Sequence, residues 1–266
     1  MKIAIIGGNR FTGKRLVDKL VDSHKVTLFN RSASGGSDAV RFDRDTDNIN
    51  LNSFDCVVDM CLYTLEQFKL IKNSIPKKVR YIFVSSGAVK YKNTFGSYAV
   101  EKESIENELR NTDLNYTIVR PSYIVGYGNH IKRLEYFIDR LVGGESIKVD
   151  NGDCILNLVD VDDVAECLKL MVLSTNDLKG KIYEIGNDTE TTVNEIIDII
   201  KKELNIKKHI IQESIEAVFP NQPFKIDNKD VKKEFGIKFK DINHTIKSFI
   251  DRRKIKYQRA KPYFSV

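Results

Sequence analysis

The first fourteen residues constrain the fold more than any other stretch of the chain. An apolar run from Ile3 to Ile6 stops at Gly7 and Gly8, and a helical pattern with Gly13 in its first turn starts almost at once. This order predicts a strand, a tight turn and a helix start, whose free backbone N–H groups favour an anion. Glycines in such a turn let a pyrophosphate approach the backbone closely. The motif alone leaves open an ordinary βα turn without a ligand.

Downstream of this turn, apolar strand patterns alternate with helical patterns. The strand patterns lie at residues 25–29, 40–42, 55–59, 79–84 and 116–119, and the helical patterns at 11–22, 65–75 and 98–110. This alternation predicts an α/β fold with a doubly wound parallel sheet of the Rossmann type. The second half has expected helices at 131–141, 162–172, 192–204, 229–235 and 243–252, with a strand at 182–185. We therefore expect a dinucleotide-binding core over 1–125, to which 153–187 return in part, and a smaller α/β substrate lobe made mainly of 126–266.

Composition narrows the class of protein. The chain has 266 residues, of which 41% are hydrophobic, and no apolar run approaches the ~18 residues of a membrane span. The four cysteines and four histidines show neither metal-ligand nor C-x-x-C spacing, so we expect reduced cysteines, no metal and a cytoplasmic location. Residues 201–266 carry 17 Lys and Arg against 8 Asp and Glu. This excess indicates either an anionic partner or, as we favour, lysines on solvated helix faces.

The motif Tyr98-x-x-x-Lys102 places a phenol and an ammonium group one turn apart on a predicted helix face. A nearby cation favours the phenolate, so such a tyrosine can exchange a proton with a substrate hydroxyl or carbonyl while hydride moves. Ser86 ends the preceding strand pattern and can hydrogen-bond the same substrate oxygen. The motif alone is weak, since Tyr257-x-x-x-Lys261 repeats it near the end of the chain. Position therefore makes Tyr98, Lys102 and Ser86 the predicted catalytic set.

The end of the second predicted strand bears on the choice of nicotinamide dinucleotide. An NAD site usually has an acidic residue there, ~20 residues past the glycines, to hold the ribose. The sequence instead reads Phe29-Asn30-Arg31. Arg31 can pair a 2′-phosphate bidentately, and Arg10 in the glycine turn points to the same preference. We therefore expect NADP or NAD, with NADP slightly favoured, and the alternative is NAD held by Asn30.

With these motifs in order, the chain resembles the extended short-chain dehydrogenase/reductases of the NAD(P)-dependent epimerase/dehydratase type. Arg120-Pro121 after the next strand and Asp160-Val-Asp-Asp-Val-Ala165 at a helix start add to the resemblance. The variant Gly-Gly-x-Arg-Phe-x-Gly, with Asp43-Arg-Asp45 after the third strand, most resembles one branch of this family. That branch contains bacterial proteins described as sugar epimerases and the chloroplast stem-loop RNA-binding proteins.

The resemblance implies a role for each matching position. Tyr98 would be the acid/base, Lys102 its activator and a ribose ligand, and Ser86 the donor to the substrate oxygen. The positions implied along the cofactor are Gly7, Arg10, Phe11, Thr12, Gly13, Asn30, Arg31, Asp43, Arg44, Met60, Cys61, Tyr63, Ser85, Lys102, Pro121, Tyr123 and Ile124. The implied activity is that of an NAD(P)-dependent epimerase or reductase acting on a secondary alcohol or ketone of a sugar or sugar nucleotide.

Two features leave alternatives open. The stretch 155–159 lacks the arginine that such epimerases commonly place there for a substrate diphosphate, which argues against a UDP- or dTDP-sugar unless Lys132 and Arg133 supply the charge. The branch resemblance and the basic C-terminal region keep a second reading, a non-catalytic nucleotide-binding protein that binds RNA or senses redox state. We favour the enzyme.

Related proteins often dimerise through the helix of the Tyr-x-x-x-Lys motif. In this chain Ile105 and Leu109 are candidates for such a dimer contact, unless they are core residues.

Overall fold

The computed structural model describes the backbone of residues 1–32 and 39–260, with side chains to Arg253. These residues form two compact units. The first contains residues 1–122, 162–185 and 226–238, and the second contains 123–161, 186–225 and the chain from 239 onward. Within the described ranges, no helix combines the length and the apolar character needed to cross a membrane.

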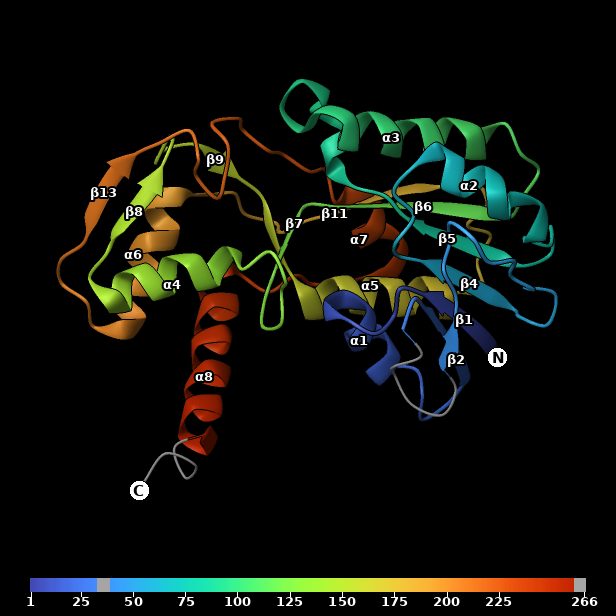
Figure 1. The fold of residues 1–266 in the computed structure, drawn as a ribbon, viewed down its shortest axis with the longest axis horizontal. Coiled ribbons are helices and arrows are strands. Elements are labelled where there is room, and N and C mark those ends of the chain that lie inside the picture. Colours follow the sequence, from blue (N-terminus) through green and yellow to red (C-terminus); the bar gives the residue numbers. More distant parts are fainter. Residues whose placement is uncertain (33–38, 261–266) are drawn as a thin grey trace. The chain divides into compact units, whose positions relative to one another are not determined.

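A seven-stranded parallel sheet forms the centre of the first unit (Figure 1). The strands are β1 (Lys2–Ile6), β2 (Lys25–Asn30), β3 (Ala39–Arg41), β4 (Cys56–Asp59), β5 (Arg80–Val84), β6 (Tyr116–Pro121) and β11 (Ile182–Ile185). They lie in the order β11-β6-β5-β4-β1-β2-β3, and all neighbouring pairs are parallel. The direction of winding reverses between β1 and β4, which is where open α/β sheets bind ligands beyond their carboxyl ends. The predicted Rossmann-type fold is confirmed.

Helices cover both faces of this sheet. They are α1 (Phe11–Asp18), α2 (Leu65–Ile71), α3 (Lys92–Arg110), α5 (Val161–Leu173) and α7 (Lys229–Phe235), with 3₁₀ turns η1 (Lys72–Ser74) and η2 (Gly87–Lys90). Helices α2 and α3 lie on one face, and α1 and α5 on the other (Figure 1). Phe68 of α2 and Ile105 and Leu109 of α3 are buried in one core with the strands, and burying a side chain of this kind stabilises the fold by ~1.5–3 kcal/mol. Ile105 and Leu109 are therefore core residues and not a dimer surface.

Helix α3 begins earlier than predicted, at Lys92 rather than Tyr98. Its backbone breaks at Gly96, where φ is 52° and ψ is −136°, a conformation that glycine adopts at little cost. Tyr98 consequently lies two residues past the break, in the first turn of the continuous helix. The helices predicted at 11–22 and 65–75 also end early, at Asp18 and Ile71, and η1 continues the second of them.

The second unit combines short two-stranded sheets with longer helices. The strands are β7 (Tyr123–Val125) with β10 (Leu158–Asp160), β9 (Ile155–Leu156) with β12 (Thr191–Thr192), and β8 (Ser146–Val149) with β13 (Ile210–Glu213). The helices are α4 (Arg133–Gly143), α6 (Val193–Leu204) and α8 (Ile242–Ala260). The predicted capping box starts α6, because Thr192 Oγ1 accepts from the Glu195 N–H (3.1 Å) and Glu195 Oε2 from the Thr192 N–H (2.8 Å). None of these strands was predicted, since segments of two to four residues show no clear two-residue period.

Candidate functional site

The glycine turn between β1 and α1 packs backbone directly against backbone. Gly7 has a φ of +86°, and its N–H donates to the carbonyl of Phe29 (2.9 Å). A Cβ at Gly13 would lie 2.7 Å from the Cα of Gly8, so a larger residue would push α1 away from the strand. Arg10 precedes the helix in an extended conformation, and the first turn of α1 contains no acidic residue. The amino end of α1 is therefore suited to an anion.

Two buried polar side chains lie at the carboxyl ends of β2 and β3. Asn30 ends β2 and is 6% exposed, yet its Oδ1 and Nδ2 have no hydrogen-bond partner. Arg44, shortly after β3, is equally buried, and its Nε and Nη1 also have no partner. An unpaired buried polar group costs about 1–3 kcal/mol. Such groups at the carboxyl ends of β2 and β3 fit a polar ligand, as the adenosine half of a dinucleotide requires.

The remaining nitrogen of Arg44 belongs to a buried ion pair. Arg44 Nη2 donates to Oδ1 of Asp59 (2.6 Å), the last residue of β4, and the hydroxyl of Tyr81 donates to Oδ2 of Asp59 (2.7 Å). Burial alone would lower the pKa of Arg44, but the Asp59 carboxylate raises it above its ordinary value. Burial and the same carboxylate raise the pKa of Tyr81. Asp59 was not predicted as a site residue, although a carboxylate that ends an apolar strand is a visible signal.

Lys102 on α3 is 2% exposed and reaches the carboxyl ends of two strands. Its Nζ donates to the carbonyl of Leu62 (2.7 Å), which follows β4, and to that of Val84 (3.1 Å), which ends β5. Burial lowers the pKa of Lys102 to about 8, and the nearby Asp59 carboxylate acts in the opposite direction. The buried ammonium group is therefore held by two backbone carbonyls, and among the neighbouring charges Asp59 acts on it most strongly.

Tyr98 and Ser86 lie on elements that flank this lysine. The Tyr98 side chain is exposed, and its ring centroid is 5.9 Å from Lys102 Nζ. The ring of Tyr63 is also exposed and lies 5.2 Å from the same nitrogen, so two phenols flank one ammonium group. Ser86 Oγ accepts from the Ala88 N–H (3.1 Å) as the N-cap of η2, which leaves its hydroxyl hydrogen available to donate.

Ser85, in contrast to Ser86, is engaged inside the unit. Its Oγ donates to Oε1 of Glu106 on α3 (2.6 Å), and Glu106 is fully buried. Glu106 also accepts from Arg120 Nε (2.9 Å) on β6 and from Arg110 Nη2 (3.1 Å). This network ties β5, α3 and β6 together beside Lys102. The predicted contact of Ser85 with a cofactor stays a prediction.

The other predicted positions of the first unit lie at or shortly after the carboxyl ends of β1, β2, β3, β4 and β6. Arg10 and Arg31 are exposed, Thr12 and Pro121 are buried, and Phe11, Asp43, Met60 and Cys61 are partly buried. Ser122, directly after β6, is a further candidate that was not predicted, because its buried Oγ has no partner. The described residues contain no cluster of three His, Cys, Asp or Glu side chains arranged for a metal ion.

Tyr123 and Ile124 lie in β7 of the second unit. The ring of Tyr123 packs against Phe219 and Phe224, with centroid distances of 5.1 and 4.6 Å, and the Arg133 guanidinium lies 5.0 Å from its centroid. The predicted position of Tyr123 and Ile124 beside a nicotinamide stays a prediction. Within the second motif match, Lys261 and the side chain of Tyr257 fall outside the described part of the chain.

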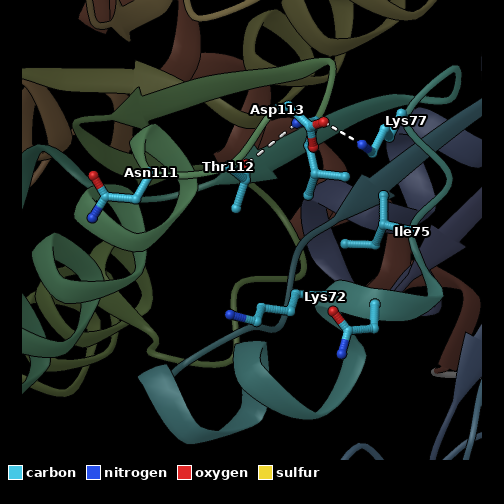
Figure 2. Close-up of a pocket in the computed structure, with 8 residues that line it drawn as sticks. Lys72, Ile75, Lys77, Asn111, Thr112 and Asp113 are labelled. Carbon is cyan, nitrogen blue, oxygen red and sulfur yellow. Dashed lines mark hydrogen bonds and ion pairs between the residues drawn. The ribbon is translucent and has the colours of Figure 1, made fainter.

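The hollow shown in Figure 2 lies at the opposite edge of the sheet, before the amino ends of β5 and β6. Its lining residues are Lys72, Asn73, Ile75, Lys77, Asn111, Thr112, Asp113 and Leu114. Lys72 Nζ is paired with Glu108 (2.8 Å), and Lys77 is paired with Asp113. Because both lysines already have carboxylate partners, we assign no ligand to this hollow.

Sequence comparison places these residues in a known family. Residues 76–186, which include the Tyr-x-x-x-Lys motif, match the model of the NAD dependent epimerase/dehydratase family. The chain is 32% identical over 227 residues to the chloroplast stem-loop binding protein of 41 kDa b of Arabidopsis thaliana. That alignment covers 72% of this chain and 60% of the relative, so the chain spans less than two thirds of the relative's length.

Solved structures with a similar fold cover almost the whole chain. The UDP-glucose 4-epimerase of Thermotoga maritima matches with a TM-score of 0.78 at 19% identity, covering 97% of this chain and 100% of that one. The UDP-glucuronic acid 4-epimerase of Bacillus cereus, in complex with UDP-glucuronic acid and NAD, matches with a TM-score of 0.81 at 15% identity and the same coverage. At these identities the likeness concerns the fold. Together with the motifs, the matched family model places residues 76–186 of the chain in the NAD-dependent epimerase/dehydratase family.

Proposed function

We propose that this protein is an NAD(P)-dependent epimerase or reductase that acts on a secondary alcohol or ketone of a sugar or sugar nucleotide. The observation that carries the proposal is the setting of Lys102, buried at the carboxyl ends of β4 and β5 and one helical turn from Tyr98. The glycine turn belongs to the same unit and ends β1, the strand beside β4.

The first unit would hold the cofactor by three of its features. The backbone N–H groups at the amino end of α1 would bind the diphosphate. The unpaired side-chain groups of Asn30 and Arg44 would bind the adenosine half, which explains why the fold tolerates them. Lys102 has a third N–H beyond the two that the carbonyls accept, and this N–H would reach a ribose hydroxyl. When bound, the nicotinamide supplies the hydride chemistry.

The chain's own residues would handle the proton. Tyr98 would take the proton from the substrate hydroxyl as the carbon loses its hydride, and would return it when the carbonyl is reduced. The Lys102 ammonium would favour the Tyr98 phenolate by its charge. Ser86 would donate its hydroxyl hydrogen to the substrate oxygen and so orient it. For an anionic sugar derivative, we name Arg133 of the second unit, whose guanidinium lies 5.0 Å from the Tyr123 ring centroid, as a candidate contact.

The end of β2 favours NADP over NAD within this proposal. No carboxylate stands there to hold the ribose hydroxyls, and the exposed Arg31 follows the buried Asn30. The solved relative from Bacillus cereus was determined with NAD, which remains the alternative. We expect Arg31→Ala to weaken NADP binding about tenfold, as for a lost charge-assisted hydrogen bond, and to spare NAD. Calorimetric titration with both dinucleotides checks this, and equal effects on the two would refute the assignment.

The function itself is tested by direct cofactor binding. The purified protein should quench or shift nicotinamide fluorescence on titration with NADPH or NADH. Gly13→Val should abolish this signal, because a Cβ at residue 13 meets backbone atoms of the turn. Gly143→Ala, at the end of α4 in the second unit, is a matched glycine control, because its added Cβ would meet only the side chain of Glu145, at 3.4 Å. If the wild-type chain binds neither dinucleotide, the proposal fails.

A second function, RNA binding, has two specific observations in its favour. The chain is 32% identical over 227 residues to a stem-loop binding protein, and residues 201–266 carry a large excess of basic residues. Binding through phosphate contacts would weaken steeply with salt. Titration of structured RNA at rising salt concentration separates the two functions, because the absence of binding at low salt removes the alternative.

A further inference from the structure

Three buried charged groups are coupled where β4 ends. Asp59 pairs with Arg44 through a contact of 2.6 Å, and both charges act on the buried ammonium of Lys102. Asp59 attracts that ammonium and Arg44 repels it. One buried carboxylate thus lies near two buried cations, so the protonation of each of the three groups depends on the charges of the other two.

The backbone links the same groups. Asp59 and Tyr81 join β4 to β5 through the hydrogen bond of 2.7 Å between their side chains. Three residues further along each chain segment, the carbonyls of Leu62 and Val84 accept the two hydrogen bonds of Lys102. The side chain that balances the charge of Lys102 therefore also fixes the two segments that hold its ammonium group.

We propose that Asp59 is a positioning residue for Lys102. The carboxylate of Asp59 is fixed by Arg44 and Tyr81, and it keeps the buried Lys102 ammonium protonated beside Tyr98, the residue that exchanges a proton with the substrate. The proposal rests on the proposed function for its catalytic meaning. The charge coupling itself exists with or without a cofactor.

The other charged and titratable groups near Lys102 do not replace Asp59. Glu106, one turn along α3, also raises the pKa of Lys102, but less than Asp59 does, and it is paired with two arginines, Arg110 and Arg120. Burial and the Asp59 carboxylate raise the pKa of the Cys61 thiol, which favours its neutral form. Tyr63 and Tyr98 present rings to the ammonium, and burial raises the pKa of Tyr63. Asp59 is therefore the counter-charge to test.

The experiment is an NMR titration of the full-length protein labelled with ¹³C at lysine Cε. One lysine should titrate near pH 8, apart from the others, and Lys102→Met should remove this signal. Asp59→Asn should lower the pKa of Lys102 by about one unit, as expected for the loss of a neighbouring opposite charge. Arg44→Met should raise it. Asp55→Asn, at the other end of β4, is the matched control and should leave it unchanged.

Opposite shifts in the two variants support the proposal, because a merely structural role for Asp59 predicts no such sign. If Asp59→Asn fails to fold with Arg44 left unpaired, the double variant Asp59→Asn/Arg44→Met removes both charges, and its Lys102 pKa should stay close to the wild-type value. Shifts of the Lys102 pKa below about 0.3 unit in both single variants overturn the proposal, as does such a small shift in Arg44→Met alone where Asp59→Asn does not fold. Failure of the proposed function would appear separately, as a chain with these shifts that binds no nicotinamide dinucleotide.

Discussion

The carboxyl edge of the sheet has two regions that treat buried polar groups in opposite ways. At the ends of β2 and β3, Asn30 and Arg44 keep four side-chain N and O atoms without a partner. At the ends of β4, β5 and β6, Lys102 and Glu106 have several short contacts within the unit. The first region leaves buried polar atoms for a ligand, whereas Lys102 and Glu106 in the second region already have partners within the unit. Variants should therefore affect ligand affinity in the first and turnover or stability in the second.

Tyr98→Phe should show the largest effect, and on turnover alone. Loss of a positioned acid/base group typically costs 10²–10⁴-fold in rate, whereas the variant keeps the aromatic ring beside Lys102. Turnover and dinucleotide affinity should be measured in parallel. Tyr63→Phe is the matched control, since its ring lies at a similar distance from the ammonium. If Tyr63→Phe loses turnover and Tyr98→Phe keeps it, Tyr63 is the acid/base and the assignment of Tyr98 from the motif is wrong.

Glu106→Gln should be the most destabilising change in the second region. Arg120, Arg110 and Ser85 all bond to this buried carboxylate, so its loss leaves Arg120 with only the longer ion pair to Glu184 (3.7 Å). Removing one partner of a buried pair costs about 3–5 kcal/mol. Urea unfolding measures the change. Glu103→Gln, on the same helix and paired with the exposed Lys92, should cost under about 1 kcal/mol. Similar costs for the two glutamates would contradict the description of the Glu106 network as a structural unit.

Lys102→Met tests the charge held in the second region through the pH dependence of stability. Burial lowers the pKa of Lys102 to about 8 in the folded chain, while the unfolded value stays near 10.5. Between these values the unfolded state binds more protons, so the wild-type chain gains stability as pH rises from 8 to 10.5. The gain amounts to at most about 3 kcal/mol. Because other groups titrate in this range, the quantity to measure is the stability difference from Lys102→Met at pH 7.5 and pH 10. A constant difference would mean that Lys102 has an ordinary pKa.

The sequence specified the first unit well and the second poorly, for physical reasons. The glycine turn and the Tyr98-to-Lys102 spacing are local patterns, and the parallel sheet follows from long apolar runs separated by helices. The ion pair between Arg44 and Asp59 joins residues far apart in the chain, so no spacing rule reveals it. The two-residue strands β9 and β12 pair across more than 30 residues of chain, which a local pattern does not encode.

The smallest expected effect is also the most direct test of the contrast between the regions. Asn30→Leu removes two buried polar atoms that have no partner, so the ligand-free chain should be unchanged or more stable by about 1 kcal/mol. Asn157 offers a matched buried asparagine, since its Nδ2 donates to the Asn187 carbonyl and its Oδ1 accepts from the Asn187 N–H, both at 2.9 Å. Asn157→Leu should lower the free energy of unfolding by about 2 kcal/mol or more, because it leaves the buried N–H and carbonyl of Asn187 without these partners.

Thermal and urea unfolding of both variants, followed by dinucleotide titration of Asn30→Leu, measure stability and affinity separately. The first region awaits a ligand if Asn30→Leu keeps its stability and loses dinucleotide affinity. Equal destabilisation by the two substitutions would mean that Asn30 contributes to the ligand-free fold in the same way as Asn157. In that case the unpaired atoms at the end of β2 would no longer support an adenosine site, and the glycine turn would have to carry cofactor binding without them.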